Sequence, residues 1–296
     1  MATIKADQIE EIEMIPTGLF IDKLLGGGIP KKRMVEIVGE PGMGKSTLCY
    51  QIVAEAQKRG QKCLWADVEG TFTAQYARLL GVNMSELDVQ QEEYAEAHLN
   101  ALIDFIENET YDLIILDSIG TLTPRTEHEK LIGEAIIGGQ AKPVSQFARK
   151  AAIKLQKKNV ALVAVNHQSL NIMNGSKESR GGASWNYHKA TSIHLSKKFN
   201  AVLKQGEAIV GYVVIATVKE KNKMVGNVGT KLEARYINNE GFSKSADLMQ
   251  DAIDKGLFEK KGNTFYWGEM KLGMNNALRE KFKDEDFAAK VKAAIG

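Results

Sequence analysis

The sequence has little of what marks secreted, disulfide-bonded and membrane proteins. Its 296 residues include two cysteines, Cys49 and Cys63. Neither belongs to a Cys-x-x-Cys pair or a Cys/His cluster, so we predict no zinc site and no disulfide framework, but two buried thiols in a reducing compartment. No run of about 18 apolar residues occurs, which excludes a membrane-spanning helix. The charged segment from Met1 to Glu13 lacks the apolar centre of a secretory signal.

The chain also lacks an excess of charge of one sign. Its 39 Lys and Arg residues against 37 Asp and Glu residues leave a formal net charge of +2. Binding to nucleic acid would therefore have to depend on local basic patches. The hydrophobic share of 44% and the charged share of 26% are ordinary for a globular protein and exclude disordered, collagen-like and coiled-coil chains. The length suits one large domain, or one large and one small domain.

Short apolar runs alternate with helical patterns along the first two thirds of the chain. Runs at 34–38, 64–68, 113–116 and 160–165 are nearly continuous, as expected for strands buried on both faces. Between the last two, apolar residues recur at helical spacing from Val144 to Leu155. This alternation predicts an α/β fold with a mostly parallel central sheet. Residues 208–218 and 229–237 are expected to extend that sheet with two long antiparallel strands.

A turn-forming cluster at Asn238-Asn239-Glu240-Gly241 predicts a domain boundary. We divide the chain into a short N-terminal extension (1–13), a core (14–238) and a small C-terminal α+β domain (239–296). The small domain is expected to contain a helix near 244–255, a strand at Phe265-Tyr266-Trp267 and one or two terminal helices.

A phosphate-binding loop is expected directly after the first of these strands. Residues 39–46 fit G-x-x-x-x-G-K-[ST] and lie between a predicted strand and a predicted helix. Glycines let backbone N–H groups surround phosphates, and the helix N-terminus adds its positive end. The alternative is a chance glycine turn. The predicted nucleotide-binding residues are Gly39, Glu40, Pro41, Gly42, Met43, Gly44, Lys45, Ser46 and Thr47, with Lys45 reaching the β- and γ-phosphates.

Two carboxylates complete the predicted site for ATP and Mg²⁺. Asp117 ends the 113–116 run and, with the Ser46 hydroxyl, is the predicted ligand of Mg²⁺. Glu69 follows the second strand, where a carboxylate can orient the attacking water. The alternatives are a capping aspartate and a solvated glutamate.

The motifs, in this order, resemble those of the RecA family of ATP-dependent DNA recombinases over about residues 14–296. The matching segments are Ile15-Pro16-Thr17-Gly18, Leu25-Gly26-Gly27-Gly28-Ile29-Pro30, the phosphate loop, Asp67-Val68-Glu69, Tyr76-Ala77-Arg78-Leu79-Leu80-Gly81-Val82, Asp117-Ser118, Val165-Asn166-His167, Gly181-Gly182 with Tyr187, Lys221-Asn222-Lys223 and Asn239-Glu240-Gly241-Phe242.

The resemblance implies roles for several of the matching side chains. Glu69 would be the catalytic base, acting with Lys45, and His167 would sense the γ-phosphate. Lys221 and Lys223 would reach the ATP of a neighbouring subunit, and Tyr76 would stack on adenine. The alternatives are a strand-end histidine, an exposed lysine turn and a core tyrosine.

The resemblance also implies two DNA-binding loops, at 126–140 and 168–189. Ile137 and Ile172 would insert between bases, as apolar wedges do in other DNA complexes, although both could instead pack on the core. Four basic residues could pair with phosphates or be simply solvated: Lys142, Arg149, Arg180 and Lys189.

The implied protein is a DNA-dependent ATPase that forms a helical filament on single-stranded DNA, pairs it with homologous double-stranded DNA and exchanges strands. Its ATP site would be composite between subunits, and it would act in the cytoplasm of a bacterium or of a phage-infected cell. His167 replaces a glutamine of the bacterial proteins and is more similar to phage-encoded strand-exchange proteins. About 13 residues precede the core, so the family's N-terminal helix is expected to be absent or reduced to a stretch around Ile4, Ile9 and Ile12.

Other functions are kept as alternatives. An accessory ATPase of the same fold would bind DNA without exchanging strands. A ring helicase would need an arginine finger near the last core strands, where Arg235 is the arginine present. A DNA-coating protein without catalysis would not need Lys45, Glu69 and Asp117 together.

Overall fold

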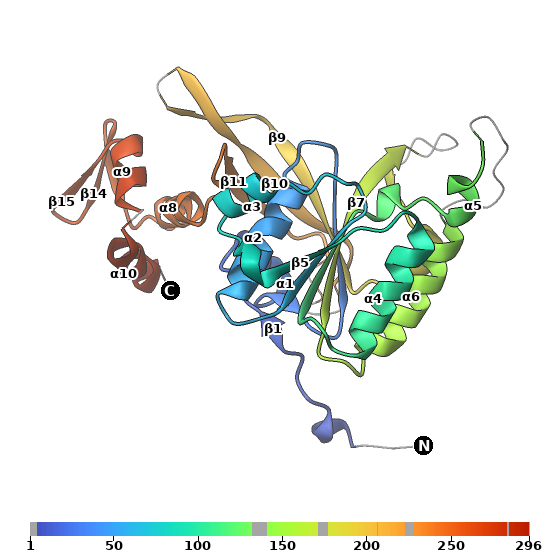
Figure 1. The fold of residues 1–296 in the computed structure, drawn as a ribbon. Helices are drawn as coiled ribbons and strands as arrows, with labels where there is room; N and C mark the ends of the chain where they lie inside the picture. The colour runs from blue at the N-terminus through green and yellow to red at the C-terminus, as the bar shows by residue number, and fades with distance from the viewer. Residues whose placement is uncertain are drawn as a thin grey trace. The chain divides into compact units, whose positions relative to one another are not determined.

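The computed structural model describes residues 5–131, 141–170, 177–205, 207–222, 226, 228–282 and 284–295. A large mixed sheet runs through it (Figure 1). Its strands are β3 (Met34–Gly39), β4 (Cys63–Asp67), β5 (Leu87–Gln90), β6 (Leu113–Asp117), β7 (Ala161–Leu170), β8 (Lys177–Ser179), β9 (Thr191–Gln205), β10 (Ala208–Asn222), β11 (Lys231–Ile237) and β12 (Gly241–Phe242). They follow the order β12-β11-β10-β9-β3-β7-β6-β4-β5, with β8 paired to β7.

The centre of this sheet is parallel. The strand β3 pairs in parallel with β7 and β9, and β6 pairs in parallel with β7 and β4. Every residue of β3, β4 and β6 is buried, which explains the continuous apolar runs in the sequence. The predicted α/β class with a mostly parallel sheet is confirmed.

Helices cover both faces of the sheet. On one face, α2 (Lys45–Gln57) packs on the sheet through buried residues such as Leu48 and Ile52. The other face carries α4 (Ala95–Glu107), α6 (Ala141–Leu155) and α7 (Gly182–His188), whose apolar side chains form one core with β3, β4, β6 and β7. Figure 1 shows α4 and α6 side by side. Shorter elements are α1 (Phe20–Leu25), α3 (Ala74–Leu79), α5 (Arg125–His128), β1 (Met14–Ile15) and β2 (Ile29–Pro30).

The C-terminal residues build a second, small core. It joins α8 (Lys244–Asp254), α9 (Asn275–Lys281) and α10 (Glu285–Ile295) to an antiparallel sheet of β13 (Glu259–Lys261), β14 (Thr264–Trp267) and β15 (Met270–Gly273). Aromatic rings make up much of this core, with Phe282 and Phe287 meeting edge to face at 5.2 Å. The predicted small α+β part is confirmed, and its first helix lies almost where the sequence indicates.

Contacts divide the chain into two compact units, 1–196 with 216–232, and 197–215 with 233–296. The strands β9 and β10 each run through both units, and the division at residue 238 stays a prediction. The N–H of Asn238 donates to the carbonyl of Val210, and the N–H of Val218 donates to the carbonyl of Thr230. These bonds join the two ends of the predicted strands 208–218 and 229–237 in antiparallel order. Both cysteines are buried free thiols, as expected.

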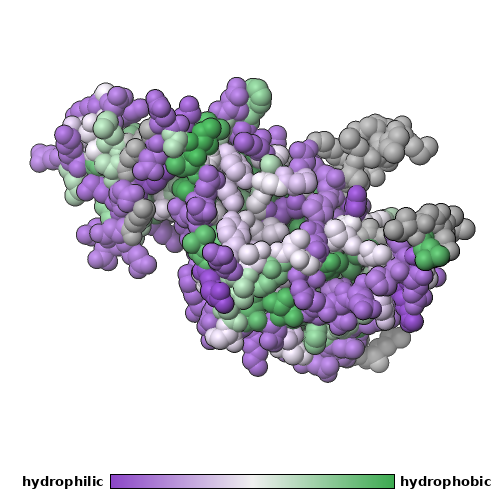
Figure 2. Space-filling model, turned by 45° about the horizontal axis from the view of Figure 1, so that its top comes forward, coloured by the Kyte–Doolittle hydropathy of each residue, from purple (hydrophilic) through white to green (hydrophobic). Residues whose placement is uncertain are grey.

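Most of the face drawn in Figure 2 is hydrophilic, and hydrophobic groups gather there in small patches. Within the described ranges, no helix combines the length and apolar composition needed to cross a membrane.

Candidate ATP and DNA site

The phosphate loop connects β3 to α2 as the motif predicts. Gly42 and Gly44 have φ values of 77° and 79°, in the left-handed region that favours glycine, and Gly44 caps α2. This backbone turns the first N–H groups of α2 toward the space above the loop, where a phosphate can bind. The fold therefore supplies the backbone cradle that the motif requires.

Gly39, the first residue of the loop, is needed for close strand packing. A Cβ atom at this position would lie 2.9 Å from the carbonyl oxygen of Leu195 in β9. In the parallel register Gly39 also lies opposite His167 of β7. The sheet thus brings the loop next to the predicted γ-phosphate sensor.

Lys45 begins α2, and its side chain is largely buried. Its ammonium donates a hydrogen bond of 3.1 Å to the carbonyl of Glu40, across the loop. Burial lowers the pKa of Lys45, and the carboxylates of Asp117 and Glu69 partly oppose this effect. The amine is held at the position from which it can reach a bound phosphate.

Asp117 lies at the end of β6, deep in the same edge of the sheet. Burial raises its pKa to about 6, against the lowering effect of a hydrogen bond from Ser46. Its Oδ1 atom is buried and has no hydrogen-bond partner among the residues that the structure describes. A buried carboxylate oxygen without a partner, next to a hydroxyl, fits a hard cation such as Mg²⁺.

Glu69 forms a cluster with the side chains of Ser118 and His167. The Oε1 atom of Glu69 accepts a hydrogen bond of 2.5 Å from the Ser118 hydroxyl and lies 2.8 Å from Nε2 of His167. Burial alone would raise the pKa of Glu69, but the hydrogen bonds from Ser118 and His167 outweigh it and leave the pKa below its ordinary value. Glu69 is therefore an ionised carboxylate at neutral pH, as a general base must be.

These groups meet because the carboxyl ends of neighbouring parallel strands meet at one edge of a sheet. Asp67, which ends β4, is in register with Asp117, which ends β6. Asp67 is not among the residues to which the sequence assigns a role. Its carboxylate accepts backbone hydrogen bonds from Thr71 at 3.0 Å and Phe72 at 3.3 Å, so it shapes the turn that carries Glu69.

Tyr76, the predicted adenine-stacking residue, lies half-buried on α3. Its hydroxyl is 3.1 Å from that of Thr47, directly after the phosphate loop. Its ring meets Tyr50 edge to face at 6.1 Å. Tyr50 was not singled out from sequence, because a tyrosine in a buried helix carries no motif.

Three predicted DNA contacts are exposed on the side of α6 and α7. Lys142 and Arg149 are seven residues apart on α6, which places them on one face. Arg149 contacts the Ser184 hydroxyl of α7 at 3.5 Å, and Arg180 donates a hydrogen bond of 2.8 Å to the carbonyl of Gly120. Ile137, Ile172 and Lys223 lie outside the described residues, as does the side chain of Lys221 at the end of β10.

The prediction that Lys189 pairs with DNA phosphates is wrong for this structure. Its side chain is 0% exposed, and its ammonium lies 2.6 Å from the carboxylate of Glu36, which is equally buried. Lys189 lies two residues after the exposed Tyr187, and no local pattern in the sequence indicates that its side chain is buried.

Arg235, the residue that a helicase-type arginine finger would need, also has a structural partner. Its backbone N–H donates to Asp247 at 2.9 Å, and its guanidinium lies 3.3 Å from the same carboxylate. The side chain is 13% exposed. This observation gives the helicase alternative no support.

A phosphate loop between a strand and a helix, with Lys45, Asp117 and Glu69 brought together at one edge of the sheet, is the arrangement of a P-loop ATPase. The model of the RecA N-terminal domain family matches residues 1–242. Similar proteins include the RecA protein of Aquifex aeolicus, 33% identical over 304 residues that cover 99% of this chain and 87% of that one. The RecA proteins of Rhodopseudomonas palustris (33% over 298 residues, 98% and 84% covered) and Porphyromonas gingivalis (31% over 301 residues, 98% and 87% covered) are similar too.

The chain belongs to the RecA family. Membership confirms the implied function: the protein is an ATP-dependent DNA recombinase and a DNA-dependent ATPase, and it binds ATP. DNA binding and filament formation follow from the same membership. The alternative of an accessory ATPase has no better support.

Proposed function

We propose that the cluster of Glu69, Ser118 and His167 performs the hydrolytic step of this recombinase. Glu69 takes the proton of the attacking water, and Ser118 holds the carboxylate in place. His167 lies against the same oxygen and can also face a γ-phosphate, so it is suited to report whether ATP or ADP is bound. The observation that carries this proposal is the shared Oε1 atom, with His167 at 2.8 Å and Ser118 at 2.5 Å.

Lys45, Ser46 and Asp117 hold the nucleotide in this proposal. Residues 39–47 surround the phosphates and Tyr76 stacks on adenine. Ser46 and Asp117 would hold Mg²⁺, which offsets the charge of the phosphates when bound. The described residues contain no cluster of three or more metal-ligating side chains. Two protein ligands agree with the usual Mg²⁺ site, in which phosphates and water supply the other ligands.

DNA binding is proposed to use Lys142, Arg149 and Arg180 for phosphates, with Ile137 and Ile172 between bases. The protein would coat single-stranded DNA as a helical filament, search homologous double-stranded DNA and act in the cytoplasm of a bacterium or infected cell. Lys221 and Lys223 are proposed to complete the ATP site of the neighbouring subunit. The domain division of the sequence analysis, at 13 and 238, is retained as a proposal.

A mixing experiment tests the composite site. Glu69→Gln and the double variant Lys221→Ala/Lys223→Ala should each be inactive as DNA-stimulated ATPases. Mixed on single-stranded DNA, they form some interfaces that pair an intact Glu69 with intact lysines, so part of the ATPase activity should return. Mixing Glu69→Gln with Lys45→Ala is the control. Both substitutions damage the ATP site of their own protomer, so no interface has an intact site and no activity should return. Co-binding without any recovery in the first mixture would remove the lysines from the neighbour's site.

A further inference from the structure

A buried carboxylate in the middle of β3 has no part in the chemistry described above. Glu36 is 0% exposed and precedes the phosphate loop by three residues. Its Oε1 atom accepts hydrogen bonds from Asn166 at 2.7 Å and from Trp185 at 2.8 Å, and its Oε2 atom accepts from Lys189 at 2.6 Å and from Ser192 at 2.7 Å. Four donors satisfy both oxygens, as a buried charge requires.

Three of the donors belong to three different elements, and the fourth lies in the turn between two of them. Asn166 is on β7, on one side of β3, and Ser192 is on β9, on the other side. Trp185 lies in α7, and Lys189 lies where α7 leads into β9. Because an ion pair this deeply buried is costly to break, the carboxylate fixes these elements relative to one another.

One branch of the network reaches the catalytic base. The Asn166 amide, bound to Glu36, also donates to the backbone carbonyl of Arg180 at 2.6 Å. The next residue, His167, lies 2.8 Å from Glu69. Glu36 therefore connects the predicted γ-phosphate sensor with the backbone of a predicted DNA contact.

A second branch follows the continuation of β7. The Gln168 amide nitrogen can only donate, so the Nδ1 atom of His194, at 2.9 Å, accepts. The Nε2 atom of His194 then carries the proton and donates to Ser192 at 3.1 Å, and Ser192 donates to Glu36. The residues on both sides of the sensor are thus fixed to the same carboxylate.

Lys189 fixes the other end of the network. Its ammonium also donates to Asn186 of α7 at 2.9 Å. The helix α7 is bound to α6 through the Ser184 hydroxyl, which donates to the Ser145 carbonyl at 3.1 Å and contacts Arg149. Lys189 thus connects β3 to the helix pair that presents the exposed Arg149.

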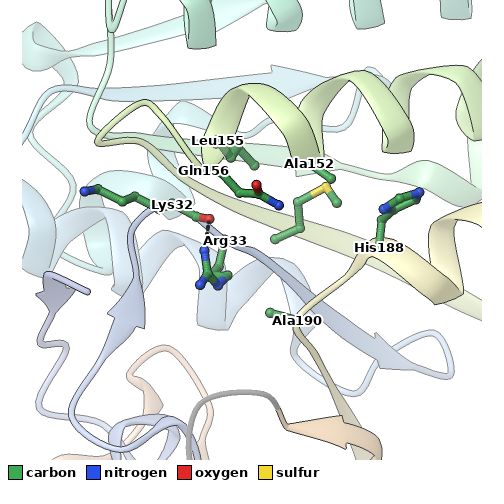
Figure 3. Close-up of a pocket in the computed structure, with 8 residues that line it drawn as sticks. Lys32, Arg33, Ala152, Leu155, Gln156, His188 and Ala190 are labelled. Atoms are coloured by element: carbon green, nitrogen blue, oxygen red, sulfur yellow. Dashed lines mark hydrogen bonds between the residues drawn. The ribbon is translucent and has the colours of Figure 1, made fainter. Parts of the chain in front are cut away.

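The surroundings of this turn show that Lys189 differs from the basic residues near it. A cavity of about 170 Å³ lies at the amino end of β3, between α6 and the turn from His188 to Ala190 (Figure 3). In Figure 3, Lys32 extends away from the cavity and Arg33 folds onto the carbonyl of Lys32. The Lys32 ammonium lies 3.3 Å from the carboxylate of Glu10. Those cations are at the surface, whereas Lys189 is inside.

We propose that Glu36 and Lys189 are positioning residues that couple the nucleotide site to DNA affinity. They hold α7 in a fixed relation to the phosphate-loop strand and to the sensor end of β7. A shift of His167 on nucleotide exchange then reaches Arg180 and α7, because the buried pair prevents these parts from moving separately. This inference rests on the proposed function, in which His167 responds to the γ-phosphate.

The test compares Lys189→Met with the double variant Glu36→Gln/Lys189→Met, in which no buried charge is left unpaired. Lys157→Met removes an exposed lysine in the turn after α6 and is the control. Anisotropy with labelled oligothymidine gives the DNA affinity with the imido analogue of ATP and with ADP, and their ratio measures the coupling. In both Lys189 variants this ratio should fall by about tenfold or more, whereas the affinity for the nucleotide should change by less than about threefold. The Lys157→Met control should keep the wild-type ratio and the wild-type nucleotide affinity.

Thermal stability separates positioning from a merely structural role. The double variant should regain stability relative to Lys189→Met without regaining the ratio. If the ratio returns with stability, or stays at the wild-type value in either folded variant, the inference is overturned. If Lys189→Met does not fold, the double variant alone decides. A wild-type ratio near one would contradict the proposed function itself, which is a different result.

Discussion

At the scale of single residues, Glu69 and Asp117 show how one sheet edge produces two kinds of carboxylate. Asp117 is buried and Glu69 is half-buried, and both lie close enough to Lys45 to affect its pKa. Glu69 gains hydrogen bonds from Ser118 and His167, which hold its pKa below the ordinary value, whereas burial of Asp117 raises its pKa to about 6. The first carboxylate is thereby kept ionised at neutral pH, and the second would gain stability if a cation bound to it.

Glu69→Gln should leave ATP binding within about threefold of wild type and lower the rate of hydrolysis by about 10² to 10⁴. The amide retains the shape of the side chain but cannot accept the proton of water. Nucleotide affinity and DNA-stimulated turnover are measured separately. Glu93→Gln, at an exposed position, is the control. Turnover near the wild-type rate in Glu69→Gln would show that another group is the base.

Asp117→Asn should stabilise the nucleotide-free protein while abolishing its ATPase activity. A folded-state pKa of about 6 against an ordinary 3.8 means that the folded protein disfavours the ionised form. Ionised Asp117 therefore lowers the free energy of unfolding by about 1 to 3 kcal/mol at pH values above the folded-state pKa, and has no such effect below the ordinary pKa. Urea unfolding with a metal chelator should therefore show a gain for Asp117→Asn at pH 7.5 that shrinks as the pH falls through 6 toward 4. An equal gain at both ends of this range would contradict the assigned pKa.

The places of candidate site residues in the fold could be predicted where a motif and its spacing are present, whereas their roles stay predictions. Gly42, Gly44 and Lys45 follow from the phosphate-loop pattern, and Glu69 and Asp117 follow from their places after apolar runs. Lys189 could not be placed correctly, because its partner Glu36 is 153 residues away in the chain. A charged residue inside an apolar run, as Glu36 is, was the one available signal that a buried partner exists.

At the scale of elements, the central strands could be predicted and β9 could not. The strands β3, β4 and β6 are buried on both faces and give continuous apolar runs. The strand β9 begins with five buried residues and continues through mostly exposed ones, including Phe199 at 88% exposure. Its composition changes along its length, so neither a continuous run nor a simple alternation is present.

Gly39→Ala should lower the free energy of unfolding by about 1 to 3 kcal/mol. The new methyl group would meet the backbone of Leu195 at 2.9 Å, and strands β3 and β9 would have to separate. Urea denaturation measures the change. Gly120→Ala is the comparison, because its Cβ would meet the movable ring of His167 at 3.1 Å and should cost less. Equal midpoints for Gly39→Ala and wild type would show that the strands do not approach as closely as described.

At the scale of the whole molecule, motif order identifies the family, whereas the division at residue 238 is a prediction from turn residues. The small C-terminal core follows from the aromatic and helical pattern after Gly241, and Phe265 is buried in it as the sequence indicates. The limits of the two units depend on the length of β9 and β10, which turn residues alone do not report. Contacts between strands distant in sequence decide this, and a single sequence does not contain them.

The central claim is that ATP binding at this site drives pairing of homologous DNA. D-loop formation between a labelled single strand and supercoiled homologous DNA tests it most directly, with ATP, with the imido analogue, with ADP and without nucleotide. The account predicts D-loops with ATP or its analogue and none with ADP or without nucleotide, and Lys45→Ala should form none under any condition. Equal yields in all four conditions, or DNA-stimulated ATP hydrolysis without any D-loop, would contradict it.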